Sequence, residues 1–297
     1  MHLELFLQHF FNALTLGSLY GLIAIGYTMV YGILRLINFA HGDILMFGAY
    51  LVFFGTFTFM LPWWLAVLAA IAGASLLGIA VDRVAYRPLR SAPRISALIS
   101  AIAVSFFIES LCVVLFTGLP RPVLQPDWLV ATWNVGGLRI LPLTAVVPLV
   151  TFALVLMLLW IIHRSKPGLA MRAISKDIET TRLLGVKVDR IIALTFGIGS
   201  ALAAASGIMW ALRYPQIHPY MGIMPGLKAF VAAVFGGIGS IQGAVIGALT
   251  LGFAEIMIVA FWPQLSGYRD AFAFVLLIAI LLGKPSGLFG QRLEEKI

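Results

Sequence analysis

The stretch that decides the fold is ILMFGAYLVFFGTFTFMLPWWLAVLAAIAGASLLGIAV, residues 44–81, which contains no charged side chain. As one α-helix its 38 residues would be about 57 Å long, whereas a bilayer core is about 30 Å thick and needs about 20 residues. Pro62 stands at the middle, next to Trp63 and Trp64. Proline breaks helices, and tryptophan favours the membrane interface. The stretch therefore predicts two membrane spans joined by a tight turn at Pro62.

Similar apolar segments occur along the rest of the chain. Of 297 residues, 61% are hydrophobic and 11% are charged, against about 25% charged in typical soluble domains. A last span is predicted to end near Gly283. The other predicted spans lie at residues 11–34, 95–117, 140–162, 191–212 and 229–262. The fold class predicted is all-α: a polytopic transmembrane helical bundle of about eight spans, forming a single domain over residues 1–297.

The segment 229–262 is long enough to enter the bilayer and come back. It contains the glycine-rich run GGIGSIQG, residues 236–243. Broken helices at membrane depth are tolerated where protein or a watery cavity surrounds them. A re-entrant break is therefore predicted at 236–243. No internal repeat is evident in the sequence, so nothing in it predicts an inverted-repeat architecture.

Basic residues orient the bundle, because they collect in cytoplasmic loops of membrane proteins. The formal net charge is +8, and the loops 82–94 and 164–190 carry most of the excess. Two spans separate these loops, so both are expected on the cytoplasmic side, near membrane lipid. The N-terminus is then expected outside, and the C-terminal tail, with Lys284, Arg292 and Lys296, in the cytoplasm. This topology accounts for the positive charge without a nucleic-acid partner.

The sequence lacks the motifs of an enzyme or an ATP-binding protein. None of its lysines is followed by Ser or Thr, so the P-loop pattern G-x-x-x-x-G-K-[ST] is absent. H-E-x-x-H and G-x-S-x-G are absent too. Five scattered histidines and one cysteine, Cys112, argue against a membrane-embedded enzyme. We expect no cofactor in this chain, and an ATP-driven process would need ATP and Mg²⁺ on separate subunits.

The loop 164–190 is polar, yet it has the pattern of a short helix. Asp177 can cap this helix, and Glu179 in its first turn suits the helix dipole. Gly185 suits a left-handed C-terminal cap.

The predicted helix, at about residues 178–184, is amphipathic. Ile178, Thr181 and Leu184 follow at intervals of three and are expected on one face. Two interpretations stay open: the helix docks a partner, or it lies on lipid headgroups.

The segment ETTRLLG, residues 179–185, resembles the E-A-A-x-x-x-G coupling motif of ABC importer permeases. In that family this loop docks into a groove of the ATPase subunit. Two Thr replace the usual Ala pair here, and the downstream I-x-L-P is absent. The residues implied in coupling to the ATPase are Asp177, Glu179, Thr180, Thr181, Arg182, Leu184 and Gly185.

Other segments resemble the permease subunits of branched-chain amino-acid ABC importers. They are INFAHGD at 37–43 followed by Met46 and GAY at 48–50, GLAMRA at 168–173, and FGGIGS at 235–240. The resemblance covers essentially the whole chain. It implies an importer in the bacterial inner membrane, with two ATPase subunits, a second homologous permease subunit and a periplasmic substrate-binding protein. Branched-chain or related amino acids are the implied substrates, and urea or short amides are an alternative.

Five polar residues are candidates for the transport pathway or a gate. Asn38, His41 and Asp43 are expected at a junction on the cytoplasmic side, where Gly42 lets the chain turn and Asp43 can cap the next helix. That junction is either purely structural or a gate.

Glu109 and Glu255 interrupt apolar stretches, where carboxylates are functional candidates by default. A position near the outer interface, or one facing a neighbouring subunit, would explain both acids without a role in transport. They also leave open a rival function, a stand-alone secondary transporter driven by protons or sodium.

Overall fold

The structure, a computed structural model, describes residues 3–90, 92–135, 138–284 and 286–290. Its longer helices are α1 (Leu3–Leu34), α3 (Trp63–Val81), α4 (Arg94–Phe116), α6 (Pro142–Arg164), α9 (Val188–Arg213) and α11 (Ile241–Phe261). Its shorter helices are α2 (His41–Phe57), α5 (Asp127–Val130), α7 (Lys166–Lys176), α8 (Ile178–Leu183), α10 (Ile223–Gly236) and α12 (Arg269–Gly283).

The helices confirm a polytopic all-α bundle. Within the described ranges, seven helical segments are long and apolar enough to cross a bilayer, and α2 and α10 are apolar but shorter. The stretch 44–81 forms most of α2 and all of α3, as predicted. Pro62 is the residue immediately before α3. It restricts the backbone there, so the chain reverses where the two helices meet.

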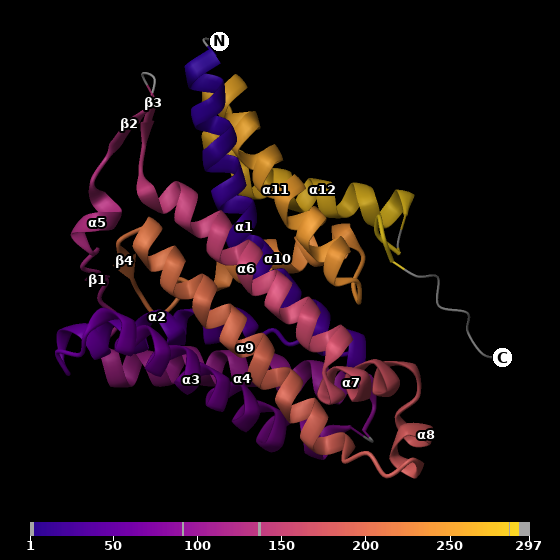
Figure 1. Cartoon of the computed structure of the whole chain (residues 1–297). Helices are drawn as coiled ribbons and strands as arrows, with labels where there is room; N and C mark the ends of the chain where they lie inside the picture. Colours follow the sequence, from indigo (N-terminus) through magenta and orange to yellow (C-terminus); the bar gives the residue numbers. More distant parts are fainter. Residues whose placement is uncertain (1–2, 91, 136–137, 285, 291–297) are drawn as a thin grey trace.

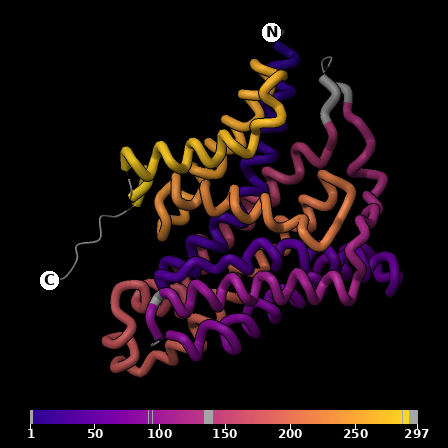
Figure 2. Tube along the Cα trace, turned by 180° about the vertical axis from the view of Figure 1, so that it is seen from behind, coloured from indigo at the N-terminus to yellow at the C-terminus, as the bar shows by residue number. Residues whose placement is uncertain are grey.

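The bundle has two distinct ends (Figure 1). At one lie α5 and the hairpin of β2 (Trp133–Val135) and β3 (Leu138–Ile140). Nearby, β1 (Arg121–Pro122) pairs antiparallel with β4 (Gln216–Ile217). Helices α7 and α8 lie at the opposite end, and the reverse view in Figure 2 shows the same separation. We refer to these as the α5 end and the α8 end.

The two most buried long helices, α1 and α9, form the centre of the bundle. Helix α1 packs on α9, α10 and α11, while α9 packs on α1, α2 and α3. Helix α1 is followed by the short helix α2 and then by α3, which packs on α2. Helix α9 is followed by the short helix α10 and then by α11, which packs on α10. The arrangement α1–α2–α3 is thus repeated by α9–α10–α11, although the sequence gives no sign of a repeat.

The chain turns back into the bundle after α1. Arg35 has a φ of +56°, a left-handed conformation that ends the helix. His41 is 1% exposed and packs against Gly26, well before the end of α1. The 17 residues of α2 reach only about 26 Å, so residues 35–40 cover the remaining depth without helix.

Asn38, His41 and Asp43 lie at the predicted junction, between the end of α1 and the first turn of α2, and this junction is buried inside the bundle. The sequence could not reveal this, because a helix start inside the bundle and one at its surface have the same local pattern.

The first turns of α2 and α10 meet inside the protein. A Cβ on Gly42 would lie 2.5 Å from the carbonyl oxygen of Gly222 and 3.3 Å from the Cα of Gly226. Gly42 lies within α2, so its role is this close approach and not the chain reversal we predicted for it.

The glycine-rich break is present where the sequence predicts it. Helix α10 ends at Gly236, and α11 begins at Ile241 and returns along α10. Gly237 and Gly239 have φ of +109° and +97°, which L side chains rarely adopt. Residues 288 and 289 donate backbone hydrogen bonds to α10 carbonyls here, at 2.9 Å each. Of the C-terminal tail, Arg292 and Lys296 lie outside the described residues.

Candidate functional site

Helix α8 is the short surface helix that the sequence predicts. A carboxylate oxygen of Asp177 accepts hydrogen bonds from the backbone N–H groups of Glu179 and Thr180, at 2.9 and 3.1 Å. The Thr180 hydroxyl donates to the other carboxylate oxygen at 2.6 Å. Gly185 follows the helix with a φ of +82°. Both predicted caps are therefore formed, although the helix is only 6 residues long.

The exposed surface of α8 combines the polar residues Glu179, Thr180 and Arg182 with a leucine. Thr181 is buried, but Leu183 and Leu184 are 88% and 77% exposed. We expected Leu184 on the same face as Thr181, but it does not lie there. The helix ends at Leu183, and Leu184 begins the following turn.

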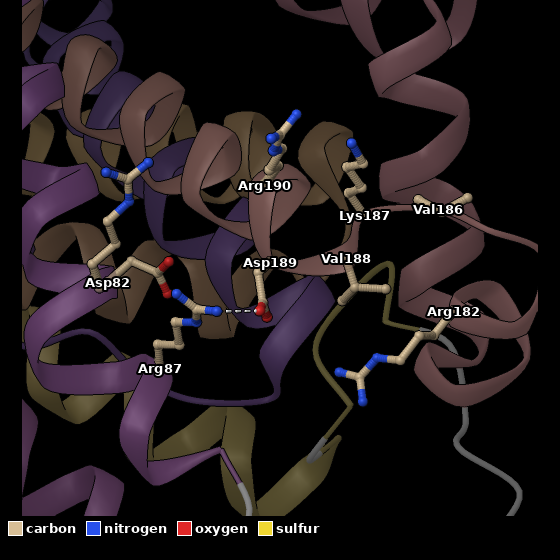
Figure 3. Close-up of a pocket in the computed structure, with 9 residues that line it drawn as sticks. Asp82, Arg87, Arg182, Val186, Lys187, Val188, Asp189 and Arg190 are labelled. Carbon is tan, nitrogen blue, oxygen red and sulfur yellow. Dashed lines mark hydrogen bonds and ion pairs between the residues drawn. The ribbon is translucent and has the colours of Figure 1, made fainter.

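A cavity of about 660 Å³ lies beside α8, between the start of α9 and the turn after α3 (Figure 3). It is lined by five basic and two acidic residues. These are Arg83, Arg87, Arg182, Lys187 and Arg190, with Asp82 and Asp189; Val186 and Val188 complete the wall. The excess of positive charge suits an acidic surface on a partner.

Ion pairs connect the two sides of this cavity. Arg90 lies 2.6 Å from Asp82 through one guanidinium nitrogen and 2.6 Å from Asp189 through another. Arg87 is 2.8 Å from Asp189, and Figure 3 shows these two side chains pointing toward each other. The side chain of Asp82 is 1% exposed, so Arg90 is the main charge that compensates it.

Replacement of Arg90 by lysine should destabilise the protein by about 1.5–3 kcal/mol, because one ammonium cannot bond both carboxylates as the guanidinium fork does. Thermal unfolding in detergent would measure this loss. Arg87→Lys is the matched control: Arg87 is 55% exposed, and its pair should contribute no more than about 1 kcal/mol. Equal shifts for both variants would contradict the bridging role of Arg90.

A second cluster forms where α2 meets α4. The Ser105 hydroxyl donates to the Asp43 carboxylate at 2.5 Å, and the carboxyl of Glu109 lies within hydrogen-bonding reach of Asp43. The prediction that Asp43 caps α2 is wrong: its side chain turns toward α4 and makes no capping hydrogen bond.

The other two residues of the predicted junction stabilise the chain reversal. The Tyr86 hydroxyl donates to the side-chain oxygen of Asn38 at 2.9 Å, and the ring of His41 lies 4.8 Å from that of Tyr27. Tyr86 and Ser105 are not predictable from the motifs of the sequence, and only the fold places them beside Asn38 and Asp43. Ser105 precedes Glu109 by four residues and so shares its helix face, a signal that could have identified it.

Glu255 belongs to a third cluster, away from Glu109. Its carboxylate lies 2.6 Å from the ammonium of Lys228 and 3.6 Å from Arg269, and it accepts a hydrogen bond from Tyr20 at 3.0 Å. Lys228 also lies 2.6 Å from Asp270. Both intramembrane acids are buried, with exposed fractions of 7% for Glu109 and 5% for Glu255.

Apolar helices long enough to cross a bilayer, with ionisable groups buried among them, are typical of multi-pass membrane proteins that move solutes. Residues 9–281 match the family described as branched-chain amino acid transport system / permease component, and the chain belongs to this family. It is therefore a transport permease subunit and not an enzyme.

Two bacterial permeases match the chain over nearly its whole length. The high-affinity branched-chain amino acid transport system permease protein LivH of Escherichia coli K12 is 45% identical over 98% of both chains. The corresponding protein BraD of Pseudomonas aeruginosa is 42% identical over 98% of both. Among solved structures, PsaBC from Streptococcus pneumoniae in complex with Fab aligns with 94% of this chain and 92% of that one, with 12% identity and a TM-score of 0.49.

Proposed function

We propose that this chain is the permease subunit of an ATP-driven importer of branched-chain or related amino acids. The observation that carries the proposal is the capped helix α8, with exposed leucines beside a basic cavity. Such a surface suits an ATPase subunit that presents an acidic and apolar groove. The substrate class is supported by the printed descriptions of the two bacterial relatives.

The complete importer would contain two ATPase subunits, a second homologous permease subunit and a periplasmic substrate-binding protein. The α8 end would face the cytoplasm of the bacterial inner membrane, because its loops hold most of the basic excess. The α5 end and the N-terminus would face outward, toward the binding protein. ATP and Mg²⁺ would bind to the ATPase subunits.

Coupling would use the residues around α8. Asp177, Glu179, Thr180, Thr181, Arg182, Leu184 and Gly185 would form or shape the docking contact. Movement of α8 would displace the start of α9, and the pairs of Arg90 with Asp189 and Asp82 would transmit it to α3. The pathway or gate would then involve the residues at the start of α2, Asn38, His41 and Asp43, together with Glu109.

Co-purification tests this proposal. We expect the tagged chain, extracted from its host in mild detergent, to carry a P-loop ATPase and a second permease. Gly185→Glu should reduce the captured ATPase about fivefold or more, because a side chain disfavours the φ of +82° that ends α8. Gly267→Glu is the control, since Gly267 lies at the turn before α12 and has open space around it.

Uptake by the complete transporter in vesicles tests the substrate and the energy source. ATP-dependent uptake of leucine, without competition by urea or acetamide, supports the proposal. A chain that purifies alone and moves leucine without ATP would instead be a secondary transporter, with Glu109 and Glu255 at the centre of its mechanism.

A further inference from the structure

A second cavity, of about 220 Å³, lies among α1, α9, α10, α11 and α12. The last turn of α9 and the first turns of α10 and α12 contribute residues to its wall. The residue after α9, Tyr214, lines it and precedes β4, which pairs with β1 near the α5 end of the bundle. Ligand pockets for drug-sized molecules are about 300–1,000 Å³, so this cavity suits a smaller solute.

The charges of this cavity balance. Lys228 and Arg269 line it together with Glu255 and Asp270. The side chains of Lys228 and Glu255 are only 8% and 5% exposed, so they are fixed groups of the interior and not surface charges. The cavity beside α8, by contrast, has a clear basic excess. Two positive and two negative groups around one small space match a ligand that carries one charge of each sign.

The uncharged part of the wall is aromatic and apolar. The rings of Tyr20, Trp210 and Tyr214 follow one another, with centroids 5.9 and 5.2 Å apart. Leu16 and Met224 lie on the same lining. An aliphatic side chain can pack on this surface while polar groups at the other side fix the orientation of the ligand.

We propose that this cavity is a binding site for one zwitterionic amino acid with an aliphatic side chain. The proposal rests on the proposed import function, which it deepens by locating a substrate site within the permease. The ligand carboxylate would bind Lys228 and Arg269, whose Nε lies 3.6 Å from Glu255 and makes no hydrogen bond within the described residues. The ligand ammonium would bind Asp270, which is 47% exposed and can turn toward an incoming group.

Direct binding to the purified full-length chain tests this site. We expect tritiated L-leucine to bind the wild type in detergent. Arg269→Gln should weaken that binding roughly ten- to hundredfold, the usual loss for one charge-assisted hydrogen bond. Because Arg269 is 36% exposed, this change should leave the fold intact. Arg213→Gln is the matched control: this arginine bonds Asn12 at 3.0 Å and does not line the cavity.

Two leucine analogues test the requirement for both charges. Isopentylamine lacks the carboxylate and 4-methylpentanoate lacks the ammonium, so each should compete with leucine at least about tenfold less well. Equal competition by either analogue would overturn a zwitterion site. Equal leucine affinity of the Arg269→Gln and Arg213→Gln variants would overturn it as well.

Uptake by the complete transporter separates this site from the function on which it rests. If the wild-type transporter imports leucine with ATP but the purified chain binds none, the site is wrong and the import function stands. If the transporter imports no leucine, the proposed function fails first. Leucine binding that Arg269→Gln weakens and Arg213→Gln does not, together with ATP-driven uptake, supports both.

Discussion

Replacement of Gly42 by alanine should prevent the bundle from assembling stably. The new methyl group would lie 2.5 Å from the carbonyl oxygen of Gly222 and 3.3 Å from the Cα of Gly226. Both neighbours are backbone atoms of the segment that begins α10, so no side chain can rotate away. Overpacking usually costs about 1–3 kcal/mol, and we expect the upper end or more here because α2 and α10 would have to separate.

The matched control for this change is Gly21→Ala. Gly21 is also a buried helix glycine, but a Cβ there would meet only the Cβ of Ala248, at 3.8 Å, an ordinary contact. Both variants add the same methyl group and the same helix propensity. Size-exclusion profiles and thermal unfolding in detergent should show an aggregated or strongly destabilised Gly42 variant and a Gly21 variant close to the wild type. A Gly42→Ala protein as stable as that control would mean that the two helix starts do not touch.

Lys228→Met should destabilise the protein by about 3–5 kcal/mol, the usual result of removing one partner of a buried ion pair. Glu255 would keep the hydrogen bond from Tyr20 and the longer 3.6 Å contact with Arg269, but it would lose its closest positive charge. The side chain of Glu255 is only 5% exposed, so water compensates the lost charge poorly. The helices α10, α11 and α12 would lose the contact that joins them, and thermal unfolding in detergent would measure the loss.

A paired variant separates lost charge compensation from lost packing. Lys228→Met combined with Glu255→Gln removes both charges, so much of the stability should return, because a neutral pair needs no compensation. Lys176→Met is the control for the side-chain change alone, since Lys176 is exposed on α7 and should shift stability by no more than about 0.5 kcal/mol. A double variant as unstable as the single one would indicate that the stem of Lys228, and not its charge, supports the fold.

The candidate site was predictable where its signals are local. Asp177 and Gly185 cap α8 because the residue types that favour caps act within a few residues of the chain. Arg90 was visible only as one of several arginines in a basic loop. Its partner Asp189 is 99 residues away, and nothing local indicates which arginine faces a carboxylate.

The buried clusters show the same limit. The sequence identified Glu109 and Glu255 as unusual, because a carboxylate among apolar residues is visible in the sequence alone. It did not identify their partners. Asp43 reaches α4 and Lys228 reaches α11 and α12 only after the chain has turned back into the bundle.

The sequence by itself therefore determined that the chain lies in a lipid bilayer, where its helices are and to which family it belongs. Hydrophobic length, proline and glycine breaks and helix caps are properties of single segments, and they predicted the spans, the turn at Pro62 and the break after Gly236. Only the tertiary structure decided where α2 and α10 begin, how α1 and α9 come to occupy the centre, and which charges meet. The physical reason is that these helices are apolar on nearly every face, so no pattern in a segment indicates which face turns inward. Close backbone contact between small residues makes that choice, and it exists only once the segments have met.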